Sequence, residues 1–256
     1  MQKTAIITGS TSGIGLAIAR QFALKGYNIA FNGLESNGAA TAANVAQEHH
    51  VEHMFSNANM TDRAALVVWV SDILSRWGRI DVLINNAGIQ HVAAIDEFPI
   101  SKWDELIHVN LTAPFHLIQA VWPAMKEQHF GRIINIASAH GLVASPFKSA
   151  YVSSKHGLVG LTKAAALEGA PYGITCNAVC PGYVNTPLVA KQISDLSKQR
   201  GLPEDQIAKE HFLQKHAISE FVSAESIAAL CLFLATEESA TITGTTLPID
   251  AGWTAQ

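Results

Sequence analysis

Short apolar runs alternate with longer segments of helical periodicity along the whole chain. The short runs predict strands at residues 4–8, 28–32, 53–56, 82–85, 132–138, 175–179 and 246–249. The longer segments predict helices at residues 13–25, 38–48, 63–77, 100–128, 150–170 and 224–236, the last with Ser223 as its N-cap. Runs such as AIIT and RIINIAS are apolar on both faces, which suits strands that are covered by helices on each side. We therefore expect an α/β fold, a single-domain doubly wound (Rossmann-like) parallel sheet that spans residues 1–256.

Residues 188–221 break this alternation. The segment is polar, and Gly201 and Pro203 separate two stretches with a helical pattern. A solvated helical hairpin and a helical substrate lid both fit this pattern. Because ligands of open α/β sheets bind at the carboxyl ends of the strands, and this segment follows such an end, we favour the lid.

The chain carries few charges: 17 Lys and Arg and 21 Asp and Glu make up 15% of its 256 residues, against about 25% in a typical soluble domain. No block of basic residues predicts nucleic-acid binding, and no run of about 18 apolar residues predicts a membrane span. A surface that is poor in charge is therefore interpreted as a set of interfaces between subunits.

The cysteines and the N-terminus bear on the compartment. Cys176 and Cys180 lie in an apolar run without a second CxxC, so we expect reduced thiols in the core and no metal site. The N-terminus reaches a glycine turn within nine residues, too soon for a signal peptide. We therefore expect a cytoplasmic protein.

A glycine-rich turn, TGSTSGIG at residues 8–15, directly follows the first predicted strand. Glycines let the backbone approach a pyrophosphate closely, and the N-terminus of the following helix offers unpaired N–H groups. The position of the turn between a strand and a helix favours a dinucleotide-binding turn over an ordinary loop.

The end of the second predicted strand, FNGLE at residues 31–35, is where the adenosine ribose of a dinucleotide would lie. A 2′-phosphate would require Arg or Lys nearby, and neither this strand end nor the glycine-rich turn carries one. The missing cations favour NAD over NADP. The partner of the 2′-hydroxyl stays open, because Glu35 is equally compatible with a solvated side chain.

Tyr151 and Lys155 are four residues apart in a predicted helix, so they share one helical face. A free phenol ionises near pH 10, and lowering its pKa to about 7 would need about 4 kcal/mol of differential interaction. A nearby cation supplies part of this free energy, and the positive charge of a nicotinamide supplies more. The pair is therefore interpreted as a proton-transfer pair.

The motifs resemble those of the short-chain dehydrogenase/reductase family, in the same order and over essentially the whole chain. They are TGSTSGIG, NNAG at residues 85–88, Asn110 in HVNL, Ser138, YVSSK at residues 151–155, and PG at residues 181–182. The resemblance implies that Tyr151 is the general acid/base and that Ser138 hydrogen-bonds the substrate oxygen. It further implies that Lys155 binds the nicotinamide ribose and lowers the pKa of Tyr151, and that Asn110 holds a water in a proton relay.

The resemblance also implies NAD as the cofactor and a homotetramer as the assembly. Besides Tyr151 and Lys155, the expected cofactor-binding residues are Gly9, Thr11, Ser12, Gly13, Ile14, Gly15, Leu34, Asn59, Met60, Asn86, Ala87, Gly88, Pro181, Gly182, Val184 and Thr186. The expected subunit contacts lie in residues 100–128, in residues 150–170 and around Trp253.

Several segments resemble, within that family, the members that act on D-3-hydroxybutyrate: residues 87–91, 132–144, 148–151, 191–192 and 252–255. A substrate carboxylate near the reacting carbinol needs cationic and amide donors beyond the Ser/Tyr pair. The available donors are Gln90, His140 and Lys148, with Gln192 closing from the lid. By resemblance, Trp253 and His91 line the pocket for the methyl end. The expected reaction is a reversible NAD-dependent oxidation of a 3-hydroxy acid to a 3-keto acid.

Three positions depart from the pattern of these relatives. Tyr183 stands where a tryptophan is expected, so the pocket could admit a slightly longer 3-hydroxy acid. Asn59 replaces the aspartate that commonly holds the adenine amino group, and Ala251 replaces a usual glycine. Two alternatives remain open. One is a sibling enzyme for an acyl thioester or a polyol, which predicts indifference to Lys148 and His140; the other is a catalytically idle NAD-sensing protein.

Overall fold

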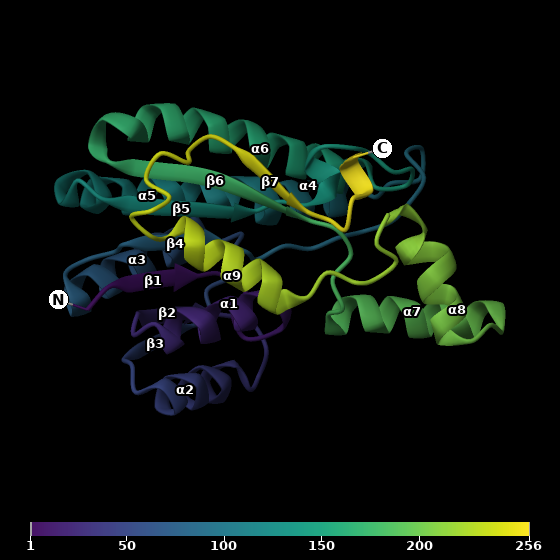
Figure 1. The fold of residues 1–256 in the computed structure, drawn as a ribbon, viewed down its shortest axis with the longest axis horizontal. Coiled ribbons are helices and arrows are strands. Elements are labelled where there is room, and N and C mark those ends of the chain that lie inside the picture. Colours follow the sequence, from purple (N-terminus) through teal and green to yellow (C-terminus); the bar gives the residue numbers. More distant parts are fainter. Residues whose placement is uncertain (1, 256) are drawn as a thin grey trace.

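The fold is a parallel sheet with helices on both faces (Figure 1). The computed structural model describes residues 2–255, without the side chains of residues 187 and 188. The strands are β1 (Thr4–Ile7), β2 (Asn28–Asn32), β3 (His53–Ser56), β4 (Val82–Asn85), β5 (Gly131–Ile136), β6 (Ile174–Pro181) and β7 (Thr246–Ile249). All neighbours pair in parallel, in the order β3-β2-β1-β4-β5-β6-β7. The predicted doubly wound α/β sheet is confirmed.

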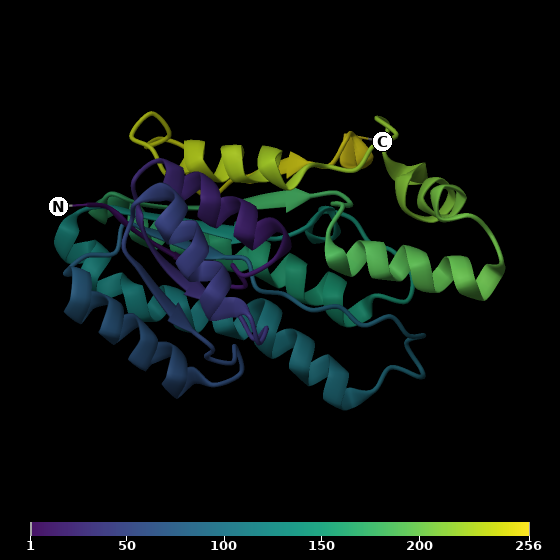
Figure 2. The same cartoon turned by 90° about the horizontal axis from the view of Figure 1, so that it is seen from below.

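Helices cover both faces of the sheet, which Figure 2 separates as layers. One face packs against α1 (Gly13–Leu24), α2 (Gly38–His49) and α9 (Ala224–Leu234). The other packs against α3 (Arg63–Trp77), α5 (Ala113–Gln128) and α6 (Ser149–Gly169). Along β1, Ala5 and Ile7 belong to the first core and Ile6 to the second, because successive side chains of a strand point to opposite faces. This two-sided burial explains the continuous apolar runs in the sequence.

The helix predicted at residues 100–128 is interrupted. It consists of α4 (Ile100–Ile107), a π-helical turn (His108–Thr112) and α5. The turn lies where Asn110 is buried and bonded to the loop after β4, and π-turns inside helices often occur at such functional positions. Hydrophobic periodicity predicted one continuous helix here and carried no signal for the π-helical turn that divides it.

The segment predicted as a lid, residues 188–221, contains helices and helical turns between residues 187 and 215. It contains α7 (Pro187–Arg200), α8 (Glu204–Ile207), a π-helical turn (Ala208–Phe212) and a 3-10 turn (Leu213–Lys215). Its helices project from one end of the molecule (Figures 1 and 2) and share a small core of their own around Ile193, Ile207 and Phe212. The expected helical excursion is therefore present, and it follows the end of β6.

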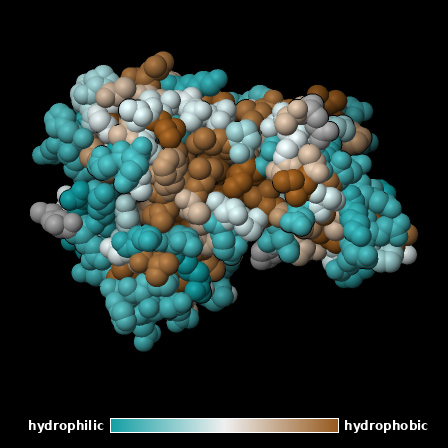
Figure 3. Space-filling view, viewed as in Figure 1, coloured by the Kyte–Doolittle hydropathy of each residue, from teal (hydrophilic) through white to brown (hydrophobic). Residues whose placement is uncertain are grey.

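The free cysteines are buried, as the sequence predicted. They are Cys176, Cys180 and Cys231. Within residues 2–255, no helix has both the length and the apolar character that crossing a bilayer requires. Figure 3 shows hydrophobic side chains gathered over β7 and α9 on one face, where Phe233 is 44% exposed.

Candidate active site

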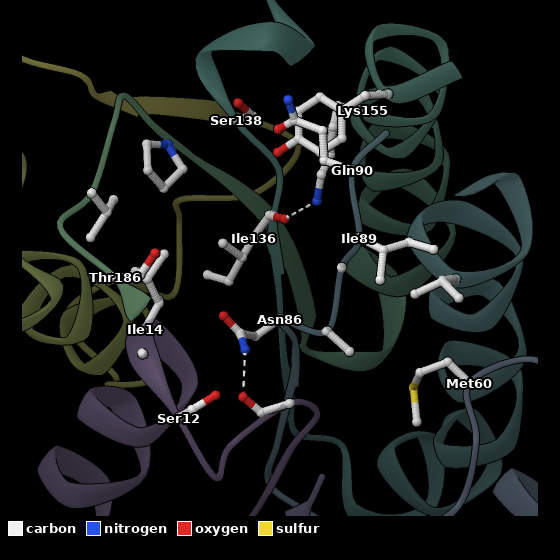
Figure 4. Close-up of a pocket in the computed structure, with 18 of the residues that line it drawn as sticks. Ser12, Ile14, Met60, Asn86, Ile89, Gln90, Ile136, Ser138, Lys155 and Thr186 are labelled. Carbon is white, nitrogen blue, oxygen red and sulfur yellow. Dashed lines mark hydrogen bonds between the residues drawn. The ribbon is translucent and has the colours of Figure 1, made fainter. Parts of the chain in front are cut away.

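One elongated cavity of about 890 Å³ runs along the carboxyl edge of the sheet, from the end of β2 to the loop after β6. In the close-up of Figure 4, Ser12 and Ile14 lie at one end and Ser138, Lys155 and Gln90 at the other. Most residues that the sequence predicted for a cofactor or substrate line this cavity. Of the predicted set, Thr11, Gly15 and Asn110 are not part of its described lining, and neither is His91.

The glycine-rich turn forms the floor of one end. Gly9 and Gly13 have φ values of 59° and 51°, in the left-handed region that favours glycine. A Cβ on Gly15 would collide with the carbonyl oxygen of Gly9, so a glycine is required here for the turn to close. Gly15 itself does not line the cavity. Asn86 Nδ2 donates to the carbonyl oxygens of Thr8 and Gly9, at 2.9 and 3.0 Å. The turn and the N-terminus of α1 thus face the cavity, as binding of a pyrophosphate requires.

Glu35 lies beside this turn, and the structure resolves the role that the sequence left open. Its carboxylate accepts hydrogen bonds from Thr11 Oγ1 and from Ser12 Oγ, the latter at 2.9 Å, and it lines the cavity. Partial burial on its own would raise the pKa of Glu35, but these hydrogen bonds outweigh it and the pKa lies below the usual value. Thr11, expected to bind the cofactor, instead orients this carboxylate from a buried position.

Leu34, Asn59 and Met60 complete the end of the cavity at which the sequence analysis expected an adenosine. Leu34 is 69% exposed, so a ligand at this end would cover an apolar side chain. Asn59 Oδ1 accepts from both the backbone N–H and the hydroxyl of Thr61, each at 3.0 Å. The amide of Asn59 therefore keeps only its N–H₂ group for a ligand, where an aspartate would present a second oxygen.

Tyr151 and Lys155 come from the same face of α6, as their spacing predicted. The Nζ of Lys155 donates to the carbonyl oxygen of Ile136 at 2.8 Å and lies 5.7 Å from the centre of the Tyr151 ring. Burial lowers the pKa of Lys155 to about 8. Burial raises the pKa of Tyr151, and a hydrogen bond with Ser138 offsets this rise only in part. In the protein without a cofactor, the pKa of Tyr151 is therefore raised and not lowered, because desolvation disfavours the phenolate.

Asn110 is fully buried in the π-helical turn. Its Oδ1 accepts from Ile89 N–H at 2.9 Å, and its Nδ2 donates to Ile89 O at 3.0 Å and to Ser154 Oγ at 3.1 Å. A Cβ on Gly88 would lie 3.3 Å from this Oδ1. Asn110 therefore fixes the loop that follows NNAG, because both polar atoms of its side chain form hydrogen bonds within the protein.

The five predicted substrate residues all line the cavity: Gln90, His140, Lys148, Gln192 and Trp253. Ring contacts join Tyr151 to His140 and His140 to Trp253. The Nζ of Lys148 donates to the Tyr183 hydroxyl at 3.3 Å, and burial, followed by the charge of Lys215, lowers the pKa of Lys148 to about 8. Tyr183 itself stacks on Trp253 with centroids 5.3 Å apart. The end of the cavity is thus an aromatic pocket that contains a desolvated cation.

His140 and His91 behave differently. His140 is 3% exposed, and its ring lies 4.9 Å from that of Trp253 and 5.8 Å from that of Tyr151. Burial, followed by the charges of Lys148 and Lys215, lowers the pKa of His140 to about 3. The placement of His91 in the pocket was wrong: its ring packs on Phe98 at 5.4 Å in the loop after β4.

Sequence reasoning missed several lining residues. Ile89, Ile136 and Val189 contribute apolar surface or backbone, and their side chains carry no chemical signal. Glu105 also lines the cavity, from α4. Only their position at the carboxyl edge could have suggested them.

The chain is similar to known proteins over its full length. The model of the short chain dehydrogenase family matches residues 3–197. A D-beta-hydroxybutyrate dehydrogenase of Rhizobium meliloti (strain 1021) is 49% identical over 264 residues, covering 100% of both chains. One of Cupriavidus necator is 46% identical, covering 99% of this chain and 98% of the relative. A solved structure of a variant of actinorhodin polyketide ketoreductase with NADPH has a TM-score of 0.93 at 32% identity, covering 100% of this chain and 98% of that one.

The buried His140 makes a prediction about acid stability. Its pKa of about 3, against 6.5 for the free group, means that the unfolded chain binds the proton more readily between these values, so stability falls as the pH drops below 6.5. The free energy of unfolding of His140→Gln should therefore fall less steeply with decreasing pH than that of the wild-type protein, by about 1 kcal/mol per pH unit. Urea unfolding of both proteins at several pH values below 6.5 measures the two slopes, and equal slopes would contradict the prediction.

Proposed function

The chain belongs to the short chain dehydrogenase family, and we propose that it catalyses the reversible, NAD-dependent oxidation of D-3-hydroxybutyrate to acetoacetate. The observation that carries this proposal is the desolvated Lys148 ammonium in an aromatic pocket beside Tyr151 and Ser138. A half-buried cation with a lowered pKa and without a carboxylate partner among its described contacts favours an anionic ligand. The two relatives named above support the same substrate.

The proposed proton transfer uses Tyr151, Ser138 and Lys155. A nicotinamide held along the cavity by Tyr151 and Lys155 would supply the hydride acceptor for C3 of the hydroxy acid. Ser138 hydrogen-bonds the reacting oxygen, and Tyr151 takes its proton in oxidation and returns it in reduction. Because burial raises the pKa of Tyr151, the phenolate needs a cation close by, and the Lys155 ammonium lies 5.7 Å from the ring. Lys155 can in turn pass the proton onward, since its own pKa is lowered to about 8.

The proposed carboxylate site consists of Lys148, His140, Gln90 and Gln192. Lys148 and the two amides offer N–H donors, and all four residues line the same end of the cavity. Gln192 belongs to α7, so we propose that residues 188–221 act as a lid whose closure adds this donor. Orientation by several donors at once would place C3 of the substrate between Ser138 and Tyr151. A carboxylate-free substrate would leave these buried donors unpaired.

The alternatives make different use of the same pocket. A longer 3-hydroxy acid would use the space that the Tyr183 ring leaves where a larger tryptophan was expected. An acyl thioester or a polyol would not need Lys148, and an idle NAD-sensing protein would not need the Ser138, Tyr151 and Lys155 set. The burial of Lys148 in the pocket favours the acid.

We propose NAD as the cofactor because the adenosine end presents an acid rather than a cation. Glu35 is held by Thr11 and Ser12 with a lowered pKa, so it is ionised at neutral pH and would repel a 2′-phosphate. The ketoreductase with NADPH shares the fold, so the fold by itself does not select the cofactor. The three buried free thiols also suit the proposed cytoplasmic location.

We propose a homotetramer because two separate apolar surfaces remain uncovered in the described chain. One is a groove of about 270 Å³ between α5 and α6 lined by Phe115, Trp122 and Leu161. The other is the surface over β7 and α9 (Figure 3). Two distinct two-fold interfaces generate a tetramer from identical subunits.

Substrate selectivity tests the carboxylate site. D-3-hydroxybutyrate should be oxidised with a kcat/KM at least about 100-fold above that of its neutral methyl ester, and 3-hydroxyvalerate probes the space beside Tyr183.

Lys148→Met should lower kcat/KM for the acid by about 10- to 100-fold, because a charged hydrogen bond is lost, and leave kcat/KM for the ester nearly unchanged. The wild-type preference for the acid should also fall as the pH rises through 8, where Lys148 loses its charge. Comparable rates with acid and ester would refute the site.

Removal of the phenol hydroxyl tests the proton-transfer step. Tyr151→Phe should lower kcat by about 10²- to 10⁴-fold, because the general acid/base is lost, while the Kd for NAD, measured by fluorescence titration, stays within about twofold. The matched control is Tyr172→Phe, a tyrosine that packs against Lys126 away from the cavity. Retention of activity in Tyr151→Phe would assign the proton transfer to another group.

Exchange of the acid at the adenosine end tests the cofactor. Glu35→Gln should raise kcat/KM for NADP relative to NAD by about tenfold or more, because one repulsive charge is removed. The exposed Glu48→Gln, which removes the partner of Arg20 on α1, is the control and should leave this ratio unchanged. Efficient use of NADP by the wild-type enzyme would contradict the prediction.

Sedimentation velocity tests the assembly. The wild-type protein should sediment with four times the chain mass of 27.4 kDa, and Phe115→Arg should yield smaller species because it charges the groove between α5 and α6. Val67→Arg on α3 is the control, since Val67 and Phe115 are equally exposed at 45%. A stable wild-type monomer would refute the tetramer.

A further inference from the structure

Lys215 connects the end of the lid segment to the wall of the substrate pocket. It is the last residue of the 3-10 turn Leu213–Lys215. Its Nζ donates to Ser145 Oγ at 2.9 Å, across 70 positions of sequence, and lies 5.2 Å from the centre of the Trp253 ring. The lid segment is therefore bound to the pocket at its far end as well as through α7.

Ser145 makes a second contact, and this contact reaches the pocket itself. Its Oγ lies 3.0 Å from Nε2 of His140, which lines the cavity next to Tyr151. The backbone N–H of His140 donates to Ser138 Oγ at 3.1 Å. Hydrogen bonds thus connect Lys215 to Ser145 and Ser145 to the His140 ring, and the backbone of the same histidine is bonded to Ser138.

The chemistry of these groups fixes the direction of the bonds. An ammonium has three N–H donors and no acceptor, so Ser145 must accept from Lys215. The hydroxyl has one hydrogen, and the adjacent positive charge favours its pointing away from Lys215, toward Nε2 of His140. His140 is neutral because its pKa is lowered to about 3, so an Nε2 that accepts leaves the ring proton on Nδ1.

We propose that Lys215 is a positioning residue: through Ser145 it holds His140 in the Nδ1–H form, so that this ring offers the pocket a donor and not a second acceptor. A donor suits an anionic substrate, whereas an exposed lone pair would repel it. The tautomer follows from the hydrogen bonds to a neutral ring and needs no substrate, whereas its consequence for a carboxylate rests on the proposed function.

The surrounding charges support this arrangement. The charges of Lys148 and Lys215 both lower the pKa of His140, and the charge of Lys215 also lowers the pKa of Lys148. Both ammonium groups disfavour a positive charge on the imidazole, so a second N–H proton on the ring is unfavourable and the ring contributes hydrogen-bond direction rather than charge. Lys215 thus differs from Lys148, which lines the cavity and can meet the substrate directly.

The tautomer can be measured without any substrate. In the full-length protein with ¹⁵N-labelled histidine, the His140 signals, assigned by their loss in His140→Gln, should show a protonated Nδ1 and an unprotonated Nε2. Lys215→Met keeps an apolar stem against Trp253 and removes the charge, and Ser145→Ala removes the hydroxyl. Both should shift His140 toward the Nε2–H form or a mixture, and Lys215→Arg should keep the wild-type form.

The matched control is Lys209→Met, which removes one exposed cation from the same lid segment. It should leave the His140 signals unchanged. A protonated Nε2 in the wild-type protein, an unchanged tautomer in both Lys215→Met and Ser145→Ala, or an equal shift in Lys209→Met would overturn the proposal. Thermal melting of each variant identifies any that fails to fold, and the remaining variant of the pair then decides.

Kinetics test the consequence for the substrate. Lys215→Met and Ser145→Ala should each raise KM for D-3-hydroxybutyrate about tenfold, with kcat, the Kd for NAD and the KM for the methyl ester within about twofold. The double variant should be no worse than either single variant, because both act through one series of bonds. Multiplying effects would overturn the proposal. If the wild-type enzyme does not oxidise the acid, the proposed function fails while the tautomer measurement still decides the role of Lys215.

Discussion

The site depends on how the protein satisfies the backbone groups at the carboxyl edge of its parallel sheet. Strands that end at one edge leave carbonyl and N–H groups there without a ladder partner, and these need side-chain partners where water is excluded. Asn86 donates hydrogen bonds to the carbonyl oxygens of Thr8 and Gly9, and Lys155 donates one to the carbonyl oxygen of Ile136. Asn110 accepts from the N–H of Ile89 and donates to its carbonyl oxygen. These bonds set the shape of the cavity that the same edge encloses.

The ammonium of Lys155 both satisfies a backbone carbonyl group and lies close to the ring of Tyr151. The residue is 4% exposed, and its ammonium donates a hydrogen bond to the end of β5 while it lies 5.7 Å from the centre of the Tyr151 ring. Burial brings its pKa to about 8, near neutral pH, where a group can both hold and release a proton. Burial, followed by the charge of Lys215, brings the pKa of Lys148 to about the same value. In a chain with so few charges, two of the 17 basic residues are thus desolvated within one cavity.

The prediction of the site from sequence succeeded where a residue's role depends on spacing and failed where it depends on orientation. Tyr151 and Lys155 were predicted from one helical turn, and the glycine-rich turn from its place after a strand. The hydrogen bonds of Thr11 to Glu35 and of Asn110 to Ser154 were not foreseen, while their expected roles toward a cofactor and a water stay predictions. His91 was placed in the pocket by resemblance, yet the loop after β4 turns its ring to Phe98. A loop's path depends on contacts with distant segments, which local sequence does not encode.

The sequence by itself determined the α/β order, the sheet edge that would carry the chemistry and most of the side chains there, because hydrophobic period and motif spacing act over short stretches of chain. Only the tertiary structure decided the hydrogen-bond role of Glu35, the π-helical turn around Asn110 and the contact of Lys215 with Ser145. It also reversed the expected shift of the Tyr151 pKa in the protein alone. The physical reason is that desolvation and hydrogen-bond partners arise from segments far apart in sequence, and the folded chain alone brings them together.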